Sequence, residues 1–122
     1  MKPRHRTFLF FVLACGLAIA PARTYAHAQL DHADPPVGST VKAPREVRMS
    51  FTQALEPRFS KAQLRSGGDK AIASGGVDPA QPTQMVIHVP NNLAPGTYKV
   101  RWQVMSVDSH PTQGNFTFTV QP

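Results

Sequence analysis

Two histidines and one aspartate are the residues of this sequence best suited to bind a metal ion. Asp108 and His110 lie in the segment SVDSHP (106–111), which follows the longest alternating apolar run of the chain. Their i, i+2 spacing directs both side chains to the same side if the backbone there stays extended. A carboxylate and an imidazole presented together at the end of a strand form a candidate metal site.

His27 completes this set only if it is the first residue of the mature chain. Its free α-amine and its imidazole Nδ1 would then bind one metal ion together. An α-amine has a pKa of about 7.7 to 8.0, so a metal ion can displace its proton near neutral pH. With a third nitrogen from His110, the set suits Cu(II), which prefers tetragonal nitrogen and oxygen coordination. Asp108 would be a weak axial ligand or would orient the site.

The N-terminal segment has the features of a secretory signal peptide covering residues 1–26. Three basic residues precede an apolar run, residues 8–20, that is too short for a comfortable membrane span. The tripeptide TYA (24–26) has small residues at the positions that a signal peptidase recognises, and cleavage there exposes His27. Cleavage after Ala28 fits the same pattern and would discard His27. A lipoprotein signal ending at Cys15 is a third reading, disfavoured because the apolar run continues beyond that residue.

Without this leader, residues 27–122 form one small domain with one core. Four of the thirteen Lys and Arg lie in the leader, so nine remain against seven Asp and Glu, and the net charge is only about +2. No basic stripe with interleaved aromatic residues occurs, so nucleic acid is not expected as a partner. The single cysteine lies in the leader, and the mature chain therefore has no disulfide.

Period-two alternation of apolar residues predicts an all-β fold. The apolar positions fall in five runs: 47–51, 62–64, 85–89, 98–104 and 116–120. Turn signals separate them, including DPPVG (34–38), SGGD (66–69), SGG (74–76), NN (91–92) and APG (94–96). This pattern favours a β-sandwich with Greek-key connections, with an open barrel as the alternative. Trp102 is predicted to lie at the centre of the core.

The remaining candidate ligands have simpler interpretations. His32 is expected in a loop, and His88 is expected to be solvated on the polar face of its strand. Met49 and Met85 fall on apolar faces and are expected in the core, whereas Met105 falls on a polar face and has no assigned role. No nucleophile elbow, Walker loop, dinucleotide fingerprint or His-Glu-x-x-His motif is present, so an enzyme is not predicted.

Seven segments, in order along the mature chain, form a specific set: HAQL (27–30), DPPVGS (34–39), MSF (49–51), LEPRFS (55–60), PGTYKVRW (95–102), SVDSHP (106–111) and GNFTF (114–118). This set resembles the CopC-type periplasmic copper-binding proteins. The resemblance implies a seven-stranded, immunoglobulin-like Greek-key β-sandwich, a cupredoxin-like barrel, that binds Cu(II). It also implies that His27 and His110 bind the metal, with Asp108 close to it.

The chain departs from the family pattern in two places. Ser109 stands where the family usually has glycine, which would alter the turn if a positive φ is needed there. The segment 67–82 contains no methionine, whereas some members have a methionine-rich loop for Cu(I). No Cu(I) methionine site is therefore expected.

Three functions are compatible with these observations. The leading hypothesis is a periplasmic Cu(II) carrier in copper homeostasis or resistance, which passes the ion to a CopD-like inner-membrane protein implied by the resemblance. A copper monooxygenase would use the same amine-and-two-histidine donors, but the domain is small for gripping a polymer. A metal-free immunoglobulin-like interaction module is the third. The sequence leaves open resistance, delivery or uptake, as well as the affinity, the oligomeric state and the cleavage site.

Overall fold

A computed structural model describes residues 15–19 and 27–122 of the chain. The predicted signal peptide, residues 1–26, therefore lies mostly outside the described residues. Residues 15–19 have no regular secondary structure and are exposed.

The described residues form an all-β fold, as predicted, with eight strands and one short 3-10 helix. The elements are β1 (Leu30–Asp34), β2 (Thr40–Val41), β3 (Glu46–Phe51), η1 (Pro57–Phe59), β4 (Lys61–Arg65), β5 (Ala71–Asp78), β6 (Gln81–His88), β7 (Gly96–Met105) and β8 (Pro111–Val120). The predicted number of strands, seven, is therefore one too few.

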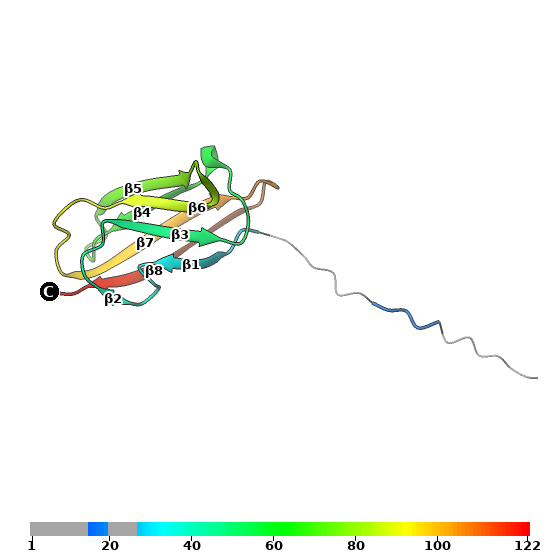
Figure 1. The fold of residues 1–122 in the computed structure, drawn as a ribbon, viewed down its shortest axis with the longest axis horizontal. Coiled ribbons are helices and arrows are strands. Elements are labelled where there is room, and N and C mark those ends of the chain that lie inside the picture. The colour runs from blue at the N-terminus through cyan, green and yellow to red at the C-terminus, as the bar shows by residue number, and fades with distance from the viewer. Residues whose placement is uncertain (1–14, 20–26) are drawn as a thin grey trace, which may run out of the picture.

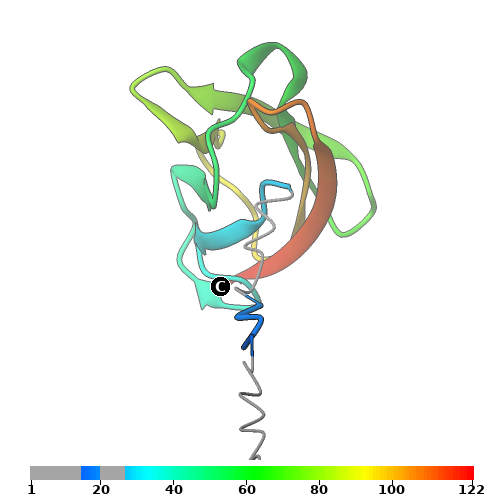
Figure 2. The same ribbon diagram turned by 90° about the vertical axis from the view of Figure 1, so that its right-hand side faces the viewer.

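All eight strands belong to one sheet in the order β1-β3-β6-β5-β4-β7-β8-β2. Every pairing is antiparallel except that of β2 with β8, which is parallel. Seen from its end, the sheet curls around an interior (Figure 2). In the side view, β1 and β8 lie along the same side of the molecule, and the β7–β8 turn lies at the end where the N-terminal segment enters β1 (Figure 1). The curl brings the segment before β1 close to the start of β8.

The prediction of a turn at residues 74–76 is wrong, because Gly75 and Gly76 lie inside β5. Gly75 pairs with Ile87 of β6. A Cβ atom on Gly75 would lie 1.9 Å from the backbone oxygen of Val86, so no side chain fits at this close approach. The burial pattern of β5 does not alternate, which is why period-two reasoning missed this strand.

The core lies inside the curl and is formed by alternate residues of the strands. Trp102 is 7% exposed and packs edge-on against Phe51, with ring centroids 5.1 Å apart and planes at 78°. Met49 and Met85 are fully buried, as predicted. The indole of Trp102 covers Gly114 on the neighbouring strand β8, where a Cβ atom would lie 2.4 Å from Cζ2 of Trp102. Gly114 therefore makes room for the central aromatic residue.

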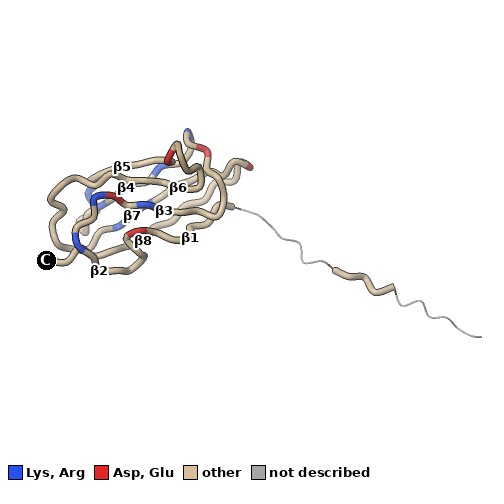
Figure 3. Tube along the Cα trace, in the orientation of Figure 1, with Lys and Arg blue, Asp and Glu red and all other residues tan. Residues whose placement is uncertain are grey.

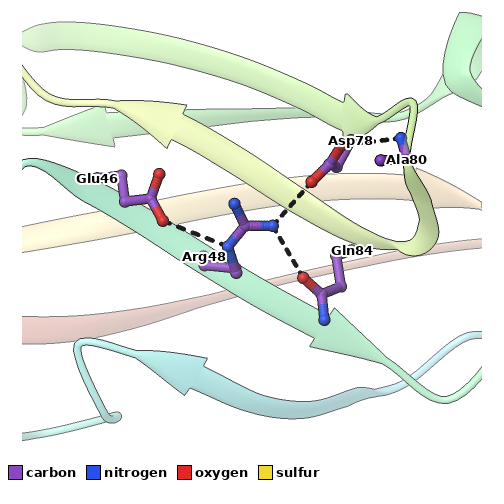
Figure 4. A network of polar contacts seen from close by, with 5 residues as sticks. All are labelled: Glu46, Arg48, Asp78, Ala80 and Gln84. Atoms are coloured by element: carbon purple, nitrogen blue, oxygen red, sulfur yellow. Dashed lines mark hydrogen bonds and ion pairs between the residues drawn. The ribbon is translucent and has the colours of Figure 1, made fainter.

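An ion-pair network fastens three strands on the outer surface (Figure 4). Arg48 of β3 donates from Nη1 to Asp78 Oδ2 of β5 and to Gln84 Oε1 of β6, both at 2.9 Å. Its Nε donates to Glu46 Oε1 at 3.3 Å. Asp78 also accepts a hydrogen bond from the backbone N–H of Ala80. The hydrogen bond from Arg48, with a smaller effect from Ala80, lowers the pKa of Asp78 below its ordinary value.

Substitution of Gly114 by alanine should destabilise the domain by about 1–3 kcal/mol, because the rigid, buried indole of Trp102 cannot yield to a Cβ atom. Urea unfolding followed by tryptophan fluorescence measures this change. Gly68→Ala is the control, since its nearest neighbour would be 3.9 Å away. Equal stability of the two variants would contradict the proposed close packing.

Asp78→Asn should lower the free energy of unfolding at neutral pH. The free energy of unfolding of this variant should also decrease less steeply in acid than that of the parent protein. Folding lowers the pKa of Asp78 from its ordinary value of 3.8. The ionised carboxylate therefore stabilises the folded protein fully at pH values above 3.8. This contribution is lost as the pH falls through the pKa that Asp78 has in the folded protein. Urea unfolding between about pH 7 and pH 2.5 should show the variant approaching the parent protein at low pH. Asp34→Asn, at an exposed position of β1, is the control.

Candidate metal centre

His27 and His110 lie next to each other in space. Their ring centroids are 5.0 Å apart, and the planes are at 75°. His27 lies in the segment before β1, and His110 immediately precedes β8. The curl of the sheet therefore brings together two imidazoles that are far apart in the sequence.

The segment that carries His27 is held firmly to the domain. Ala28 is fully buried, and its backbone oxygen accepts a hydrogen bond from Thr112 Oγ1 of β8 at 2.8 Å. Thr52, just after β3, holds the next residue: its backbone N–H donates to Gln29 O, and its Oγ1 accepts from Gln29 N, both at 2.9 Å. His27 is thus one peptide unit away from a fixed point of the backbone.

The turn between β7 and β8 is organised around Ser106, which is fully buried. Its backbone pairs with Leu55 in an isolated bridge, and its N–H donates to the oxygen of His110 at 3.1 Å. Its oxygen accepts from the N–H of Ser109 at 2.8 Å. The hydroxyl Oγ accepts from the His110 N–H at 3.3 Å and contacts the carboxylate of Asp108. A single buried serine therefore fixes the backbone of the whole turn.

Ser109 has a φ of +70°, a left-handed conformation that favours glycine. This is the position at which the CopC resemblance led us to expect glycine. The turn thus keeps the left-handed conformation with serine in this place. The backbone between Asp108 and His110 is not extended, so the condition for the i, i+2 geometry is not met, and this tight turn brings the two residues together.

Asp108 and His110 form a polar pair. Asp108 Oδ1 lies 3.2 Å from His110 Nδ1, and the two side chains are 42% and 51% exposed. The hydrogen bond from Ser106 lowers the pKa of Asp108, with a smaller contribution from His110, while burial opposes the shift. A carboxylate that accepts from Nδ1–H leaves the lone pair of a neutral imidazole on Nε2. The pair therefore orients His110 to offer Nε2 as a ligand.

The ring of His27 has a nitrogen available for binding. Its Nδ1 is buried and has no hydrogen-bond partner among the described residues. Within residues 15–19 and 27–122, no group of three or more His, Cys, Asp or Glu side chains is arranged to hold a metal ion. The two imidazoles together with Asp108 would therefore need a donor of another kind to complete a tight site.

His32, His88 and Met105 are other residues that could act as ligands in the described part of the mature domain. His32 is on β1, not in a loop as expected, and its Nδ1 lies 3.1 Å from the exposed carboxylate of Asp31. His88 is exposed at the end of β6, as predicted. Met105 is half-buried at the end of β7, opposite Pro111. None of these three residues forms a hydrogen bond, ion pair or ring contact with His27 or His110.

Sequence reasoning missed the residues that hold the site together. Ser106, Thr112 and Thr52 contact backbone or side chains close to His27 or His110. Thr112 is 84 residues from its partner Ala28, and Thr52 is 23 residues from Gln29. No local pattern predicts such pairs, although the serine at the start of SVDSHP is a typical residue for bonding to the backbone of a turn.

A family model for the CopC domain matches residues 30–121. The chain belongs to the CopC family. Copper resistance protein C of Escherichia coli is 36% identical over 119 residues, which cover 90% of this chain and 94% of that protein. Protein YobA of Escherichia coli strain K12 is 33% identical over 124 residues, which cover 99% of this chain and 100% of that protein.

Solved CopC-family structures have the same fold. The crystal structure of CopC from Methylosinus trichosporium OB3b matches with a TM-score of 0.73 and 30% identity, over 79% of this chain and 95% of that one. The methionine-rich copper resistance protein PcoC of Escherichia coli matches with a TM-score of 0.69 and 35% identity, over 79% of this chain and 100% of that one. In the described part of the present CopC-family chain, no helix is long and apolar enough to cross a membrane.

Ser106→Ala should loosen the β7–β8 turn and cost about 1–2 kcal/mol of stability, the usual cost of losing a buried hydroxyl that bonds to backbone. It should also raise the pKa of Asp108, because the largest cause of the downward shift is lost. Chemical denaturation and NMR titration of the Asp108 carboxyl group measure the two effects.

Ser60→Ala is the matched control for this substitution. Ser60 is another buried serine, and its Oγ accepts from the backbone N–H of Met105 at 3.1 Å. Its loss should destabilise the protein by a similar amount while leaving the Asp108 titration unchanged. A pKa of Asp108 that stays low in Ser106→Ala would show that His110, and not Ser106, dominates the shift.

Proposed function

We propose that this CopC-family protein is a periplasmic Cu(II) carrier in copper homeostasis or resistance. The α-amine and Nδ1 of His27 and the imidazole of His110 would bind the ion, with Asp108 close to it. The observation that carries the proposal is the 5.0 Å separation of the two histidine rings, together with the unpartnered Nδ1 of His27. The names of two of the relatives, copper resistance protein C and PcoC of Escherichia coli, refer to copper resistance and agree with this assignment.

The donor set requires removal of residues 1–26, and contacts of the next residues support that cleavage site. Ala28 is fully buried and bonds to Thr112, so cleavage after Ala28 would remove a core residue and its hydrogen bond. His27 has a positive φ of 83°, which is sterically unfavourable for a residue with a side chain. A chain that begins at His27 has no preceding carbonyl group, so this penalty disappears when the amine is freed.

The donors suit Cu(II) rather than Cu(I). Two imidazole nitrogens and an amine give the tetragonal nitrogen-rich set that Cu(II) favours, and Asp108 adds a negative charge beside it. Cu(I) prefers thioether sulfur, but Met49 and Met85 are fully buried in the core. The only other methionine in the described part of the chain, Met105, is by itself no thioether cluster. We therefore propose a Cu(II) site and no Cu(I) methionine site.

A copper-carrier function agrees better with the exposed surface of the domain than a copper monooxygenase that acts on a polymer. Trp102 and Tyr98 are 7% and 6% exposed and belong to the core, so they do not form a flat aromatic binding face. We propose that the protein binds the ion, limits its reactivity and passes it to a CopD-like inner-membrane protein. A metal-free interaction module would leave the pairing of His27 with His110 without a role.

Cu(II) titrated into protein that begins at His27 should give a nitrogen-rich tetragonal EPR spectrum. Addition of one residue before His27 should weaken Cu(II) binding at least about tenfold, because the amine moves out of reach and a chelate ring is lost. Affinities are measured by competition with a chelator of known strength. Equal affinity of the two forms would exclude the terminal amine as a ligand.

His110→Ala should also weaken Cu(II) binding at least about tenfold and remove one nitrogen from the EPR spectrum. His88→Ala is the control, since His88 is an exposed histidine on β6 and should not change either measurement. Unchanged binding by His110→Ala would refute the proposed site, even if the terminal amine proves to be a ligand.

A further inference from the structure

The structure assigns to Thr112 the role of positioning the N-terminal ligand residue, His27, against His110. This inference rests on the proposed Cu(II) site and adds a residue that binds no metal itself. Thr112 Oγ1 donates to the backbone oxygen of Ala28 at 2.8 Å, across 84 residues of sequence. Thr112 is two residues after His110, and Ala28 directly follows His27. This hydrogen bond therefore joins the two backbone segments that carry the histidines.

Thr112 is itself held rigidly. It lies in β8, which pairs with β7 at ten successive positions, and its partner Val104 is 2% exposed. The Thr112 side chain is half-buried, and a β-branched side chain has few χ1 rotamers in a strand. Its hydroxyl therefore occupies a defined position relative to His110.

Thr52 cannot replace this contact. It binds both backbone groups of Gln29, but it follows β3, which pairs with β1 and β6 and not with β8. Loss of the Thr112 hydrogen bond would leave the segment attached at Gln29 and free at His27. Among the hydrogen bonds that residues 27–29 form with the described part of the chain, only that of Thr112 reaches the strand that follows His110.

The physical effect is preorganisation. The first residue of a chain normally moves freely, and binding a metal ion would then require ordering it at an entropic cost. A hydrogen bond one residue later reduces this cost before the ion arrives. Thr112 should therefore increase the affinity for Cu(II) and should do so only when the terminal amine is a ligand.

Thr112→Val removes the hydroxyl while keeping the shape and the strand preference of the side chain. Cu(II) affinity of protein beginning at His27 should fall roughly five- to tenfold, the range expected for loss of one hydrogen bond. Hydrogen exchange of the Ala28 and Gln29 amides in copper-free protein should become faster. Thr112→Ser, which keeps the donor, should restore most of both properties, and Thr112→Ala should behave like Thr112→Val.

Thr119→Val is the matched control. Thr119 is a half-buried threonine of the same strand, at the far end, where its hydroxyl lies 3.2 Å from that of Thr97. This variant should change neither the Cu(II) affinity nor the exchange of the Ala28 and Gln29 amides. A fall in affinity equal to that of Thr112→Val would mean that any loss of stability in β8 weakens binding, and would overturn the inference.

The form with one residue added before His27 separates this inference from the proposed function. In that form, Thr112→Val should change Cu(II) affinity less than about twofold, because the amine is no longer bound. Suppose that protein beginning at His27 binds Cu(II) through its amine and that the Thr112→Val variant of it binds Cu(II) equally well. The positioning role inferred for Thr112 is then wrong, while the proposed function stands. If the unmodified protein shows no amine-dependent binding, both are wrong.

Discussion

The site depends on one constraint: the curled sheet must bring the segment before β1 against the beginning of β8. The buried methyl group of Ala28 and the hydrogen bond from Thr112 maintain this contact. Each interaction is modest, because a hydrogen bond contributes about 1 kcal/mol net. They suffice because the partner strand β8 is already fixed by its long pairing with β7. The core of the domain therefore determines where His27 lies.

Polar groups fix the position of His110 in the β7–β8 turn, as the core fixes the position of His27. His110, the proposed metal ligand at this edge of the domain, must be accessible to the ion, and it is half-exposed. Its orientation is nevertheless fixed, since Asp108 contacts Nδ1 and Ser106 holds both residues from the buried side. The exposed surface of the turn thus contains the donors, and the buried side contains the group that orders them.

Among the described residues, no Lys or Arg forms an ion pair with Asp108 of the β7–β8 turn. Lys and Arg lie on β3, β4 and β7, on η1 and in the loops at the end that holds the C-terminus, whereas the charged part of the β7–β8 turn is acidic (Figure 3). Several basic residues are already paired: Arg48 with Asp78, and Arg65 with Asp69. Neither pair includes Asp108, the only charged residue of the turn. The negative charge of Asp108, beside His110, would therefore favour a cation at the proposed site.

The sequence by itself determined the all-β class, the core positions around Trp102 and the residue types of the site, because alternation and motifs are local signals. It did not reveal β5, whose glycines are required by close backbone approach and not by a turn. Its local patterns also did not reveal that His27 meets His110, which only the family resemblance implied, or that Thr112 and Ser106 hold them. Those contacts join residues that are distant in the chain or oriented by a left-handed turn. Only the tertiary structure decided them, because the curl of the sheet sets which strand ends become neighbours.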